Sequence, residues 1–384
     1  MPAHPASAVS LYIHLPWCLH KCAYCDFNSH AVAADALPES DYTQALITDL
    51  KLASTDISNR PVQSIFIGGG TPSLFSANAI EMILQACRQY TCVTPTCEIT
   101  LETNPGTFEF QKFSDFHAAG VNRLSIGVQS FNDVNLQSLD RIHAAAEALQ
   151  AIDTAAAIGF DNINIDIMFG LPKQTLADAM EDVRIAVQQP VQHISYYQLT
   201  LEPNTIFHRF PPPLPDTDQQ WEIQEHALQL LAEHHFQRYE VSALARQNHS
   251  CVHNKHYWRY HDYLGIGAGA HTKLTLDGVI LRQQRVRQPD SYRHAVSAHK
   301  HVIQTHAVRP ADQLFEFMLN NLRLCQGFSE HHFETSTSLN WCTIQPLIAE
   351  LIEENLLDYD GMYYKASPLG YRFLDQITAR FLPE

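Results

Sequence analysis

Residues 11–25 read LYIHLPWCLHKCAYC, in which a short apolar run of strand type leads directly into three closely spaced cysteines. Up to residue 201 the chain goes on alternating short β-rich runs with longer helical patterns. The strand-type runs are residues 11–15, 62–67, 97–101, 123–128, 162–168 and 193–201, and the helical patterns are residues 41–53, 77–88, 110–119, 144–158 and 175–188. Strands separated by helices pair in parallel through right-handed crossovers, which predicts either a barrel or a doubly wound sheet.

The unusual residues of each unit come directly after its strand. The cysteines follow the first strand. The second to fifth strands are followed by Gly68-Gly69-Gly70-Thr71-Pro72, Glu102-Thr103-Asn104-Pro105-Gly106, Gln129-Ser130-Phe131 and Gly170-Leu171-Pro172. Barrel enzymes place their chemistry at this carboxyl-end rim of the strands. We therefore predict an α/β fold, a partial barrel of six βα units that is open along one side.

The proline-rich segment 210–215 marks the clearest boundary, because such a segment is stiff and extended. We expect a barrel in residues 1–215 and a linking region in residues 216–310. Residues 311–384 contain helical patterns and a hairpin with an Asp360-Gly361 turn. Helices followed by a small hairpin are typical of a winged helix, so we predict a winged-helix-like C-terminal module.

The composition indicates a globular cytosolic protein. The 384 residues include 41 Asp+Glu against 25 Lys+Arg, a formal net charge of −16, which argues against nucleic-acid binding because that mode needs surplus Lys and Arg. No basic leader and no window of 18 apolar residues is present, so we expect a cytoplasmic protein without a transmembrane segment. The chain has nine cysteines, which are not expected to form disulfides in that compartment. Those that cluster in the sequence are therefore interpreted as metal ligands.

Cys18, Cys22 and Cys25 follow the spacing C-x3-C-x2-C. Zinc sites usually combine two C-x2-C pairs, and the sequence has no second close pair. Thiolates also bind iron–sulfur clusters, in which four cysteines ordinarily hold four irons, so three leave one iron open. An open iron can chelate S-adenosylmethionine, pass an electron into its sulfonium and release a 5′-deoxyadenosyl radical. We favour this [4Fe–4S] interpretation over a Cys3His zinc site with His14, His20 or His30, and over cysteines that only pack.

Further polar residues lie on the same rim. The glycine triplet allows the backbone to approach a ligand. Taken alone it is more often a tight turn, but one βα unit after the cysteine motif it becomes a candidate to bind the methionine amino group. It lacks the Lys and Ser/Thr of a phosphate-binding loop, so it does not predict a nucleoside triphosphate. Glu102, Gln129, Arg141 and Asp166 follow or end neighbouring strands, and together they would bind the ribose hydroxyls, the carboxylate and the amino group of S-adenosylmethionine.

A second constellation, CVHNKHYW, occupies residues 251–258. Its histidines and Cys251 are competent haem-iron ligands, and its aromatic rings would stack on a porphyrin. Alternatively, the segment closes the open side of the barrel and its histidines bind backbone. Arg282, Arg285 and Arg287 would pair with haem propionates, although a solvated edge strand is the interpretation we favour. The remaining cysteines predict no second metal site.

Together these motifs resemble the radical SAM family of oxygen-independent coproporphyrinogen III oxidases and their haem-chaperone relatives. The resemblance covers nearly the whole chain and rests on residues 12–18, 67–73, 102–106, 125–131 and 166–172. It implies that Cys18, Cys22 and Cys25 bind the cluster. It also implies that S-adenosylmethionine is contacted by Tyr12, Tyr24, Gly69, Gly70, Thr71, Glu102, Gln129, Arg141 and Asp166.

Three features favour the chaperone branch of this family. The oxidases carry a further cysteine two residues after the third, where this chain has Phe27, and they have a longer segment before the cluster. Residues 253–258 resemble the H-N-x-x-Y-W signature that is associated with haem binding in the chaperones. The resemblance thus implies a haem chaperone that contacts haem through His253 and passes it to an acceptor such as a respiratory enzyme. The alternative is the oxidase, which decarboxylates two propionate side chains by radical chemistry.

Overall fold

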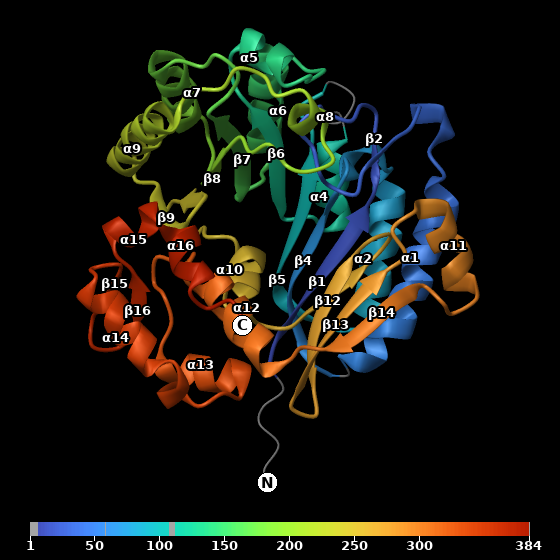
Figure 1. The fold of residues 1–384 in the computed structure, drawn as a ribbon. Coiled ribbons are helices and arrows are strands. Elements are labelled where there is room, and N and C mark those ends of the chain that lie inside the picture. The colour runs from blue at the N-terminus through green and yellow to red at the C-terminus, as the bar shows by residue number, and fades with distance from the viewer. Residues whose placement is uncertain (1–6, 58, 107–111, 384) are drawn as a thin grey trace.

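The computed structural model describes residues 7–57, 59–106 and 112–383. A sheet in the order β14-β13-β12-β11-β1-β4-β5-β6-β7-β8-β10-β9 organises the molecule (Figure 1). Its central strands are the six predicted ones: β1 (Val9–Leu15), β4 (Pro61–Gly69), β5 (Cys92–Thr103), β6 (Arg123–Gln129), β7 (Ile163–Phe169) and β8 (His193–Gln198). They are parallel and adjacent in chain order. A doubly wound sheet reverses its order near the first strand, so this unbroken order confirms the partial barrel.

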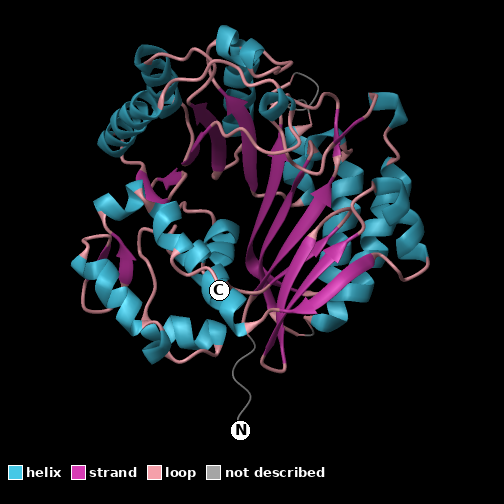
Figure 2. Cartoon of the chain, in the orientation of Figure 1, coloured by secondary structure: helices cyan, strands magenta, loops and turns pink. Residues whose placement is uncertain are grey.

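Helices return the chain between these strands and lie outside the curved sheet (Figure 2). They are α1 (Glu39–Ala53), α2 (Ala77–Tyr90), α4 (Phe113–Ala119), α6 (Ala145–Ile158) and α7 (Leu176–Gln188). The Thr175 hydroxyl accepts the Asp178 N–H and so caps the start of α7. The helix predicted over residues 110–119 is described from Phe113 on, and its first two positions lie outside the described residues.

Six more strands extend the sheet beyond its predicted part. Next to β1 lies β11 (Tyr263–Ile266), followed by the antiparallel strands β12 (His271–Leu276), β13 (Val279–Arg285) and β14 (Val302–Ala307). Next to β8 lie β10 (Ala243–Ala245) and β9 (Gln237–Glu240). Three helices connect them: α9 (Thr217–Glu233), α10 (Val252–Trp258) and α11 (Pro289–Ser297). This region shares the sheet and the hydrophobic core of the barrel, so the described residues show no separate core beginning at residue 215. The domain boundary at that residue stays a prediction.

The arginines of β13 correct the expectation of a solvated edge strand. β13 is an interior strand between β12 and β14, and Arg287 lies beyond its end. Arg285 is buried and forms an ion pair with Asp49 of α1, with 3.4 Å between Nη2 and Oδ1. Alternate residues of a strand face opposite sides, and the side toward α1 and α11 is covered. The expectation was therefore wrong for this strand.

The C-terminal module has a core of its own around Phe317, Phe328 and Trp341. Its elements are α12 (Pro310–Asn321), α13 (Glu330–Thr337), α14 (Gln345–Glu353), the hairpin β15 (Leu357–Tyr359) and β16 (Tyr364–Ala366), α15 (Pro368–Arg372) and α16 (Leu374–Ala379). Helices and a hairpin were predicted here, and both are present. In the part of the chain that is described, no helix combines the length and the hydropathy of a membrane span.

Candidate functional site

The three cysteines lie on a loop that begins in β2 (Trp17–Cys18) and returns through β3 (His30–Ala31). The two short strands pair in parallel and close the base of this cysteine loop. Cys18 is buried at the start of the loop, and Cys22 and Cys25 are partly buried. A turn joins the last two, since the Cys25 N–H donates to the Cys22 carbonyl at 3.1 Å. The protein itself thus holds the three cysteines on one short loop.

The arrangement of these thiols fits a cluster better than a single metal ion. Among the described residues, no three His, Cys, Asp or Glu side chains converge as ligands of one ion. His14 is engaged at both ring nitrogens, by the Tyr12 hydroxyl and the Asn28 carbonyl, and His20 contacts Asp140 at 2.7 Å. A [4Fe–4S] cluster binds each thiolate to a different iron, so it needs thiols spread around a pocket.

Arg141 connects the cysteine loop with the strand ends. Its Nη1 donates to the Cys22 sulfur at 3.6 Å, and its Nη2 donates to Asn104 Oδ1 and the Gly127 carbonyl at 2.8 Å each. Its Nε is buried and has no hydrogen-bond partner within the described parts of the chain. The guanidinium is therefore fixed between the cysteine loop and the strand ends.

The cysteines line a cavity of about 690 Å³, which we call the cysteine cavity. The structure brings eight of the nine residues predicted to contact S-adenosylmethionine into its lining: Tyr24, Gly69, Gly70, Thr71, Glu102, Gln129, Arg141 and Asp166. The ninth, Tyr12, lies in an adjoining cavity. Glu102 and Gln129 lie at the carboxyl ends of β5 and β6, as the rim argument predicts, whereas Asp166 lies inside β7 and Arg141 follows the short helix α5 (Asp133–Ser138).

The glycine triplet packs against the end of β1. The N–H groups of Gly69, Gly70 and Thr71 donate to Glu102 Oε2, the Leu15 carbonyl and the Trp17 carbonyl, at 3.0, 2.8 and 2.7 Å. A Cβ atom on Gly70 would lie 2.4 Å from the Trp17 oxygen, so only glycine fits there. Since these donors are used inside the protein, a ligand at the turn meets carbonyl oxygens, which suit an ammonium group.

Glu102 and Asp166 place two carboxyl groups in this cavity. Burial, opposed by the Gly69 N–H, raises the pKa of Glu102 to about 7, and the charge of Asp166 adds to the shift. Burial also raises the pKa of Asp166, although Asn164 donates to its carboxylate at 2.8 Å. Gln129 ends β6 with a positive φ of 68°, and its Oε1 accepts the Tyr197 hydroxyl at 2.7 Å. The cavity therefore offers acceptors for a ligand rich in hydroxyl and ammonium groups.

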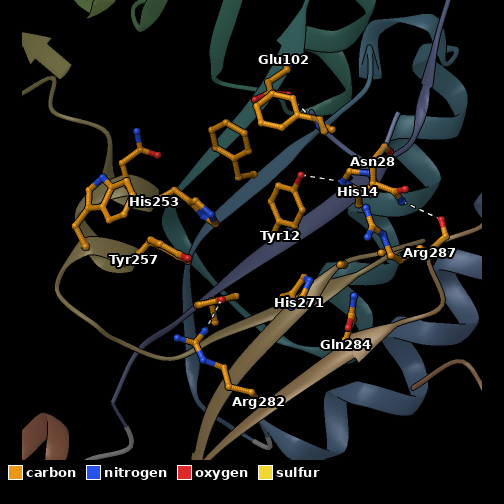
Figure 3. Close-up of a pocket in the computed structure, with 18 of the residues that line it drawn as sticks. Tyr12, His14, Asn28, Glu102, His253, Tyr257, His271, Arg282, Gln284 and Arg287 are labelled. Atoms are coloured by element: carbon orange, nitrogen blue, oxygen red, sulfur yellow. Dashed lines mark hydrogen bonds between the residues drawn. The ribbon is translucent and has the colours of Figure 1, made fainter. Parts of the chain in front are cut away.

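The adjoining cavity has a volume of about 920 Å³, and we call it the aromatic cavity (Figure 3). It shares Phe27, Gly69, Glu102 and Trp258 with the cysteine cavity. Aromatic rings form much of its wall: Tyr12, Phe66, Tyr257, Trp258 and Tyr263. Its size and its flat apolar walls suit a large planar ligand.

His253 presents its imidazole ring to this cavity. Its ring points into the cavity and lies 5.0 Å from that of Phe66, centroid to centroid (Figure 3). Its Nδ1 contacts Ser64 Oγ at 3.1 Å, and that hydroxyl donates to Ser10 Oγ, so Nδ1 carries the hydrogen and Nε2 the lone pair. Burial lowers the pKa of His253 to about 3, which keeps the imidazole neutral. A neutral imidazole with a free lone pair is a metal ligand.

Glu98 fixes the helix that carries His253. Its carboxylate accepts the N–H groups of Val252 and His253 at 3.1 Å each and the Cys251 thiol at 3.4 Å. Cys251 is therefore buried against Glu98 and does not line the aromatic cavity, whereas His253 does. His256 faces away and binds the Asp262 carbonyl at 2.7 Å, as the alternative of a barrel-closing segment predicts. α10 thus packs against β1 and β4 and still presents His253.

Comparison with known proteins agrees with this geometry. The profile of the radical SAM superfamily matches residues 12–186, and that of the HemN C-terminal domain matches residues 308–373. Heme chaperone HemW of Haemophilus influenzae is 43% identical over 389 residues, with all of both chains covered, and Heme chaperone HemW of Escherichia coli is 43% identical with 98% of each covered. The chain belongs to the HemW family. Coproporphyrinogen III oxidase (HemN) from Escherichia coli shares the fold, with a TM-score of 0.83, 22% identity and coverage of 99% of this chain and 91% of that one.

Some residues of the aromatic cavity in this member of the HemW family escaped the sequence argument. Phe66 lies inside a predicted strand, and Glu316 lies on a predicted helix, where nothing marks them as ligand contacts. Arg282 and Gln284 both line the cavity. They are two positions apart on β13, so strand alternation places them on the same face, and this is the signal that the sequence offers for them. Arg287 lines it too, whereas Arg285 does not.

The pKa of Glu102 predicts a pH effect on the stability of the ligand-free HemW-family chain. The folded protein holds this proton up to a pKa of about 7, against 4.5 ordinarily, so it binds more protons than the unfolded chain between these values. Through this window Glu102 therefore lowers the free energy of unfolding by about 3 kcal/mol as pH rises. Urea unfolding of wild type and Glu102→Gln should differ in pH dependence by this contribution.

Glu181, which is exposed on α7, supplies the matched control. Glu181→Gln is expected to keep the pH profile of the wild type. An unchanged profile in Glu102→Gln would contradict the assignment of the proton to Glu102.

Proposed function

We propose that the protein is a cytoplasmic haem chaperone that binds a [4Fe–4S] cluster, S-adenosylmethionine and haem, and passes the haem to an acceptor protein such as a respiratory enzyme. The names of the relatives with 43% identity support this function. The observation that carries it is the pair of adjoining cavities, one with three cysteines and one with His253 among aromatic rings.

The cysteine cavity supplies the groups that the cluster and S-adenosylmethionine require. A cluster on Cys18, Cys22 and Cys25 would bind the amino and carboxylate groups of S-adenosylmethionine at its open iron and deliver an electron to the sulfonium. The glycine triplet offers carbonyl oxygens to the ammonium group, and the guanidinium of Arg141, which lines the cavity, suits a carboxylate. Glu102, Gln129 and Asp166 would accept hydrogen bonds from the ribose hydroxyls.

The aromatic cavity supplies the groups that haem requires. Tyr12, Phe66 and Trp258 offer faces to the porphyrin ring, and the Nε2 of His253 offers a lone pair to the iron. Phe27 stands where the oxidases have a further cysteine, and its ring borders both cavities. The apolar side chain at this position supports haem carriage over propionate decarboxylation.

Anaerobically reconstituted protein tests the proposal in two assays. Titration with haem, followed by absorbance, should reach about one haem per chain, as one His253 ligand implies. Incubation with S-adenosylmethionine, a reductant and coproporphyrinogen III should release no CO2. Absence of haem binding, or repeated decarboxylation of coproporphyrinogen III, would show that the chaperone function is wrong.

A further inference from the structure

One wall of the aromatic cavity is a face of the sheet extension β12–β14. Arg282 and Gln284 of β13 point to this face (Figure 3). His306 of β14 lies opposite Arg282, and His271 of β12 lies opposite Gln284, so strand register brings all four side chains to one side. The opposite wall, around His253, is aromatic. The cavity therefore has an apolar side and a polar, basic side.

Arg282 is held by a carboxylate from another part of the molecule. Its Nη2 donates to Oε2 of Glu316 at 2.7 Å, and its Nη1 donates to the Tyr263 hydroxyl at 2.8 Å. The Tyr260 hydroxyl donates to the same Glu316 oxygen at 2.7 Å. Glu316 belongs to α12 of the C-terminal module, and both Glu316 and Arg282 line the cavity. The ion pair thus joins the C-terminal module to the cavity wall.

In the described part of the chain, the aromatic wall has no charged group that could bind the propionates of haem. The two propionate groups are carboxylates, and a carboxylate that enters a cavity needs a charged hydrogen-bond partner to offset the loss of water. The planar guanidinium of arginine matches carboxylate geometry. Among the described residues that line the aromatic cavity, Arg282 and Arg287 are the arginines and no lysine is present. These two arginines are therefore the side chains of the cavity that suit a carboxylate.

We propose that Arg282 binds a propionate of haem and that Glu316 competes with the propionate for the same guanidinium. This inference rests on the haem-carrying function proposed above. Arg282 binds Glu316 when no ligand carboxylate is present, and the propionate takes the place of the Glu316 carboxylate when haem enters. Haem binding then breaks a contact between β13 and α12, so cargo occupancy is coupled to the position of the C-terminal module.

The exposure of the pair makes this exchange feasible. The Arg282 and Glu316 side chains are 19% and 25% exposed, so water reaches both. The pair is partly buried rather than sealed from water, so a released Glu316 carboxylate can regain hydration. Tyr263 stays on Arg282 and keeps the guanidinium oriented during the exchange. A buried pair would resist the same replacement.

Two ligands and two variants test the exchange. The ligands are haem and its dimethyl ester, which keeps the iron and the ring but carries no carboxylate. Wild-type protein should bind haem about tenfold more tightly than the ester, and Arg282→Met should bring the two affinities together. Glu316→Gln, which removes the competing charge, should strengthen haem binding about threefold and leave ester binding unchanged.

Arg380→Met is the matched control, because Arg380 forms exposed ion pairs with Glu350 and Glu354 in the same module, away from the cavity. It should keep the wild-type preference for haem. A tenfold preference that survives in Arg282→Met, or weaker haem binding in Glu316→Gln, would overturn this inference and leave the chaperone function standing. A wild-type protein that binds neither ligand would overturn both.

Discussion

Replacing Cys22 by alanine is expected to abolish cluster assembly, so that iron and acid-labile sulfide fall from about four each per chain to background. The three cysteines lie on one short loop, and each would hold a different iron, so the loss of one leaves the cluster with two protein ligands. Arg141, which donates to the Cys22 sulfur, stays in place through Asn104 and Gly127. The cavity therefore keeps its shape while it loses a ligand. Iron and sulfide analysis of anaerobically reconstituted protein measures the effect.

Cys92 and Cys342 provide the controls, because both are exposed cysteines that do not line the cysteine cavity. Their alanine variants should assemble the cluster as the wild type does. Full iron and sulfide in Cys22→Ala would contradict the assignment of this ligand. Zinc without sulfide in the wild type would contradict the cluster itself.

The barrel and its rim were predictable because their signals are local. Each strand is a short apolar run, and the residues that follow it, from the cysteines to Gln129, break the pattern at the strand end. Parallel strands bring their carboxyl ends to one edge, so position along the chain translates directly into position on the rim. Cys18 and Glu102 share a cavity for this reason although 84 positions separate them.

The aromatic cavity was predictable only in part, because side-chain direction and long-range packing decide it. The sequence placed Cys251, His253 and His256 in one segment. It did not show that Cys251 hydrogen-bonds to Glu98 and that His256 hydrogen-bonds to the Asp262 carbonyl. Arg285 illustrates the same limit. The residues around Arg285 in the sequence suggest a solvated strand. In the structure, Arg285 is buried and its charge is paired with Asp49, which is 236 positions away.

Replacing His253 by alanine is expected to weaken haem binding by at least about 100-fold, since changes to outer-shell partners alone cost about 10–100-fold in metal affinity. The ring is neutral, because burial lowers its pKa to about 3, and its Nε2 carries the lone pair. Ser64→Ala removes the partner of Nδ1 and should cost about tenfold. Haem titrations of the three proteins measure this order, and added imidazole should restore the haem spectrum in His253→Ala.

His256→Ala tests whether the ring or the helix matters, because His256 lies on the same helix and faces away from the aromatic cavity. Its ring binds the Asp262 carbonyl, so its loss should lower the melting temperature and leave haem affinity unchanged. Equal losses of affinity in both variants would mean that haem needs an intact α10 and not the His253 ring. Rescue by imidazole in His253→Ala alone would support His253 as the iron ligand, because a purely structural role does not respond to a free ligand.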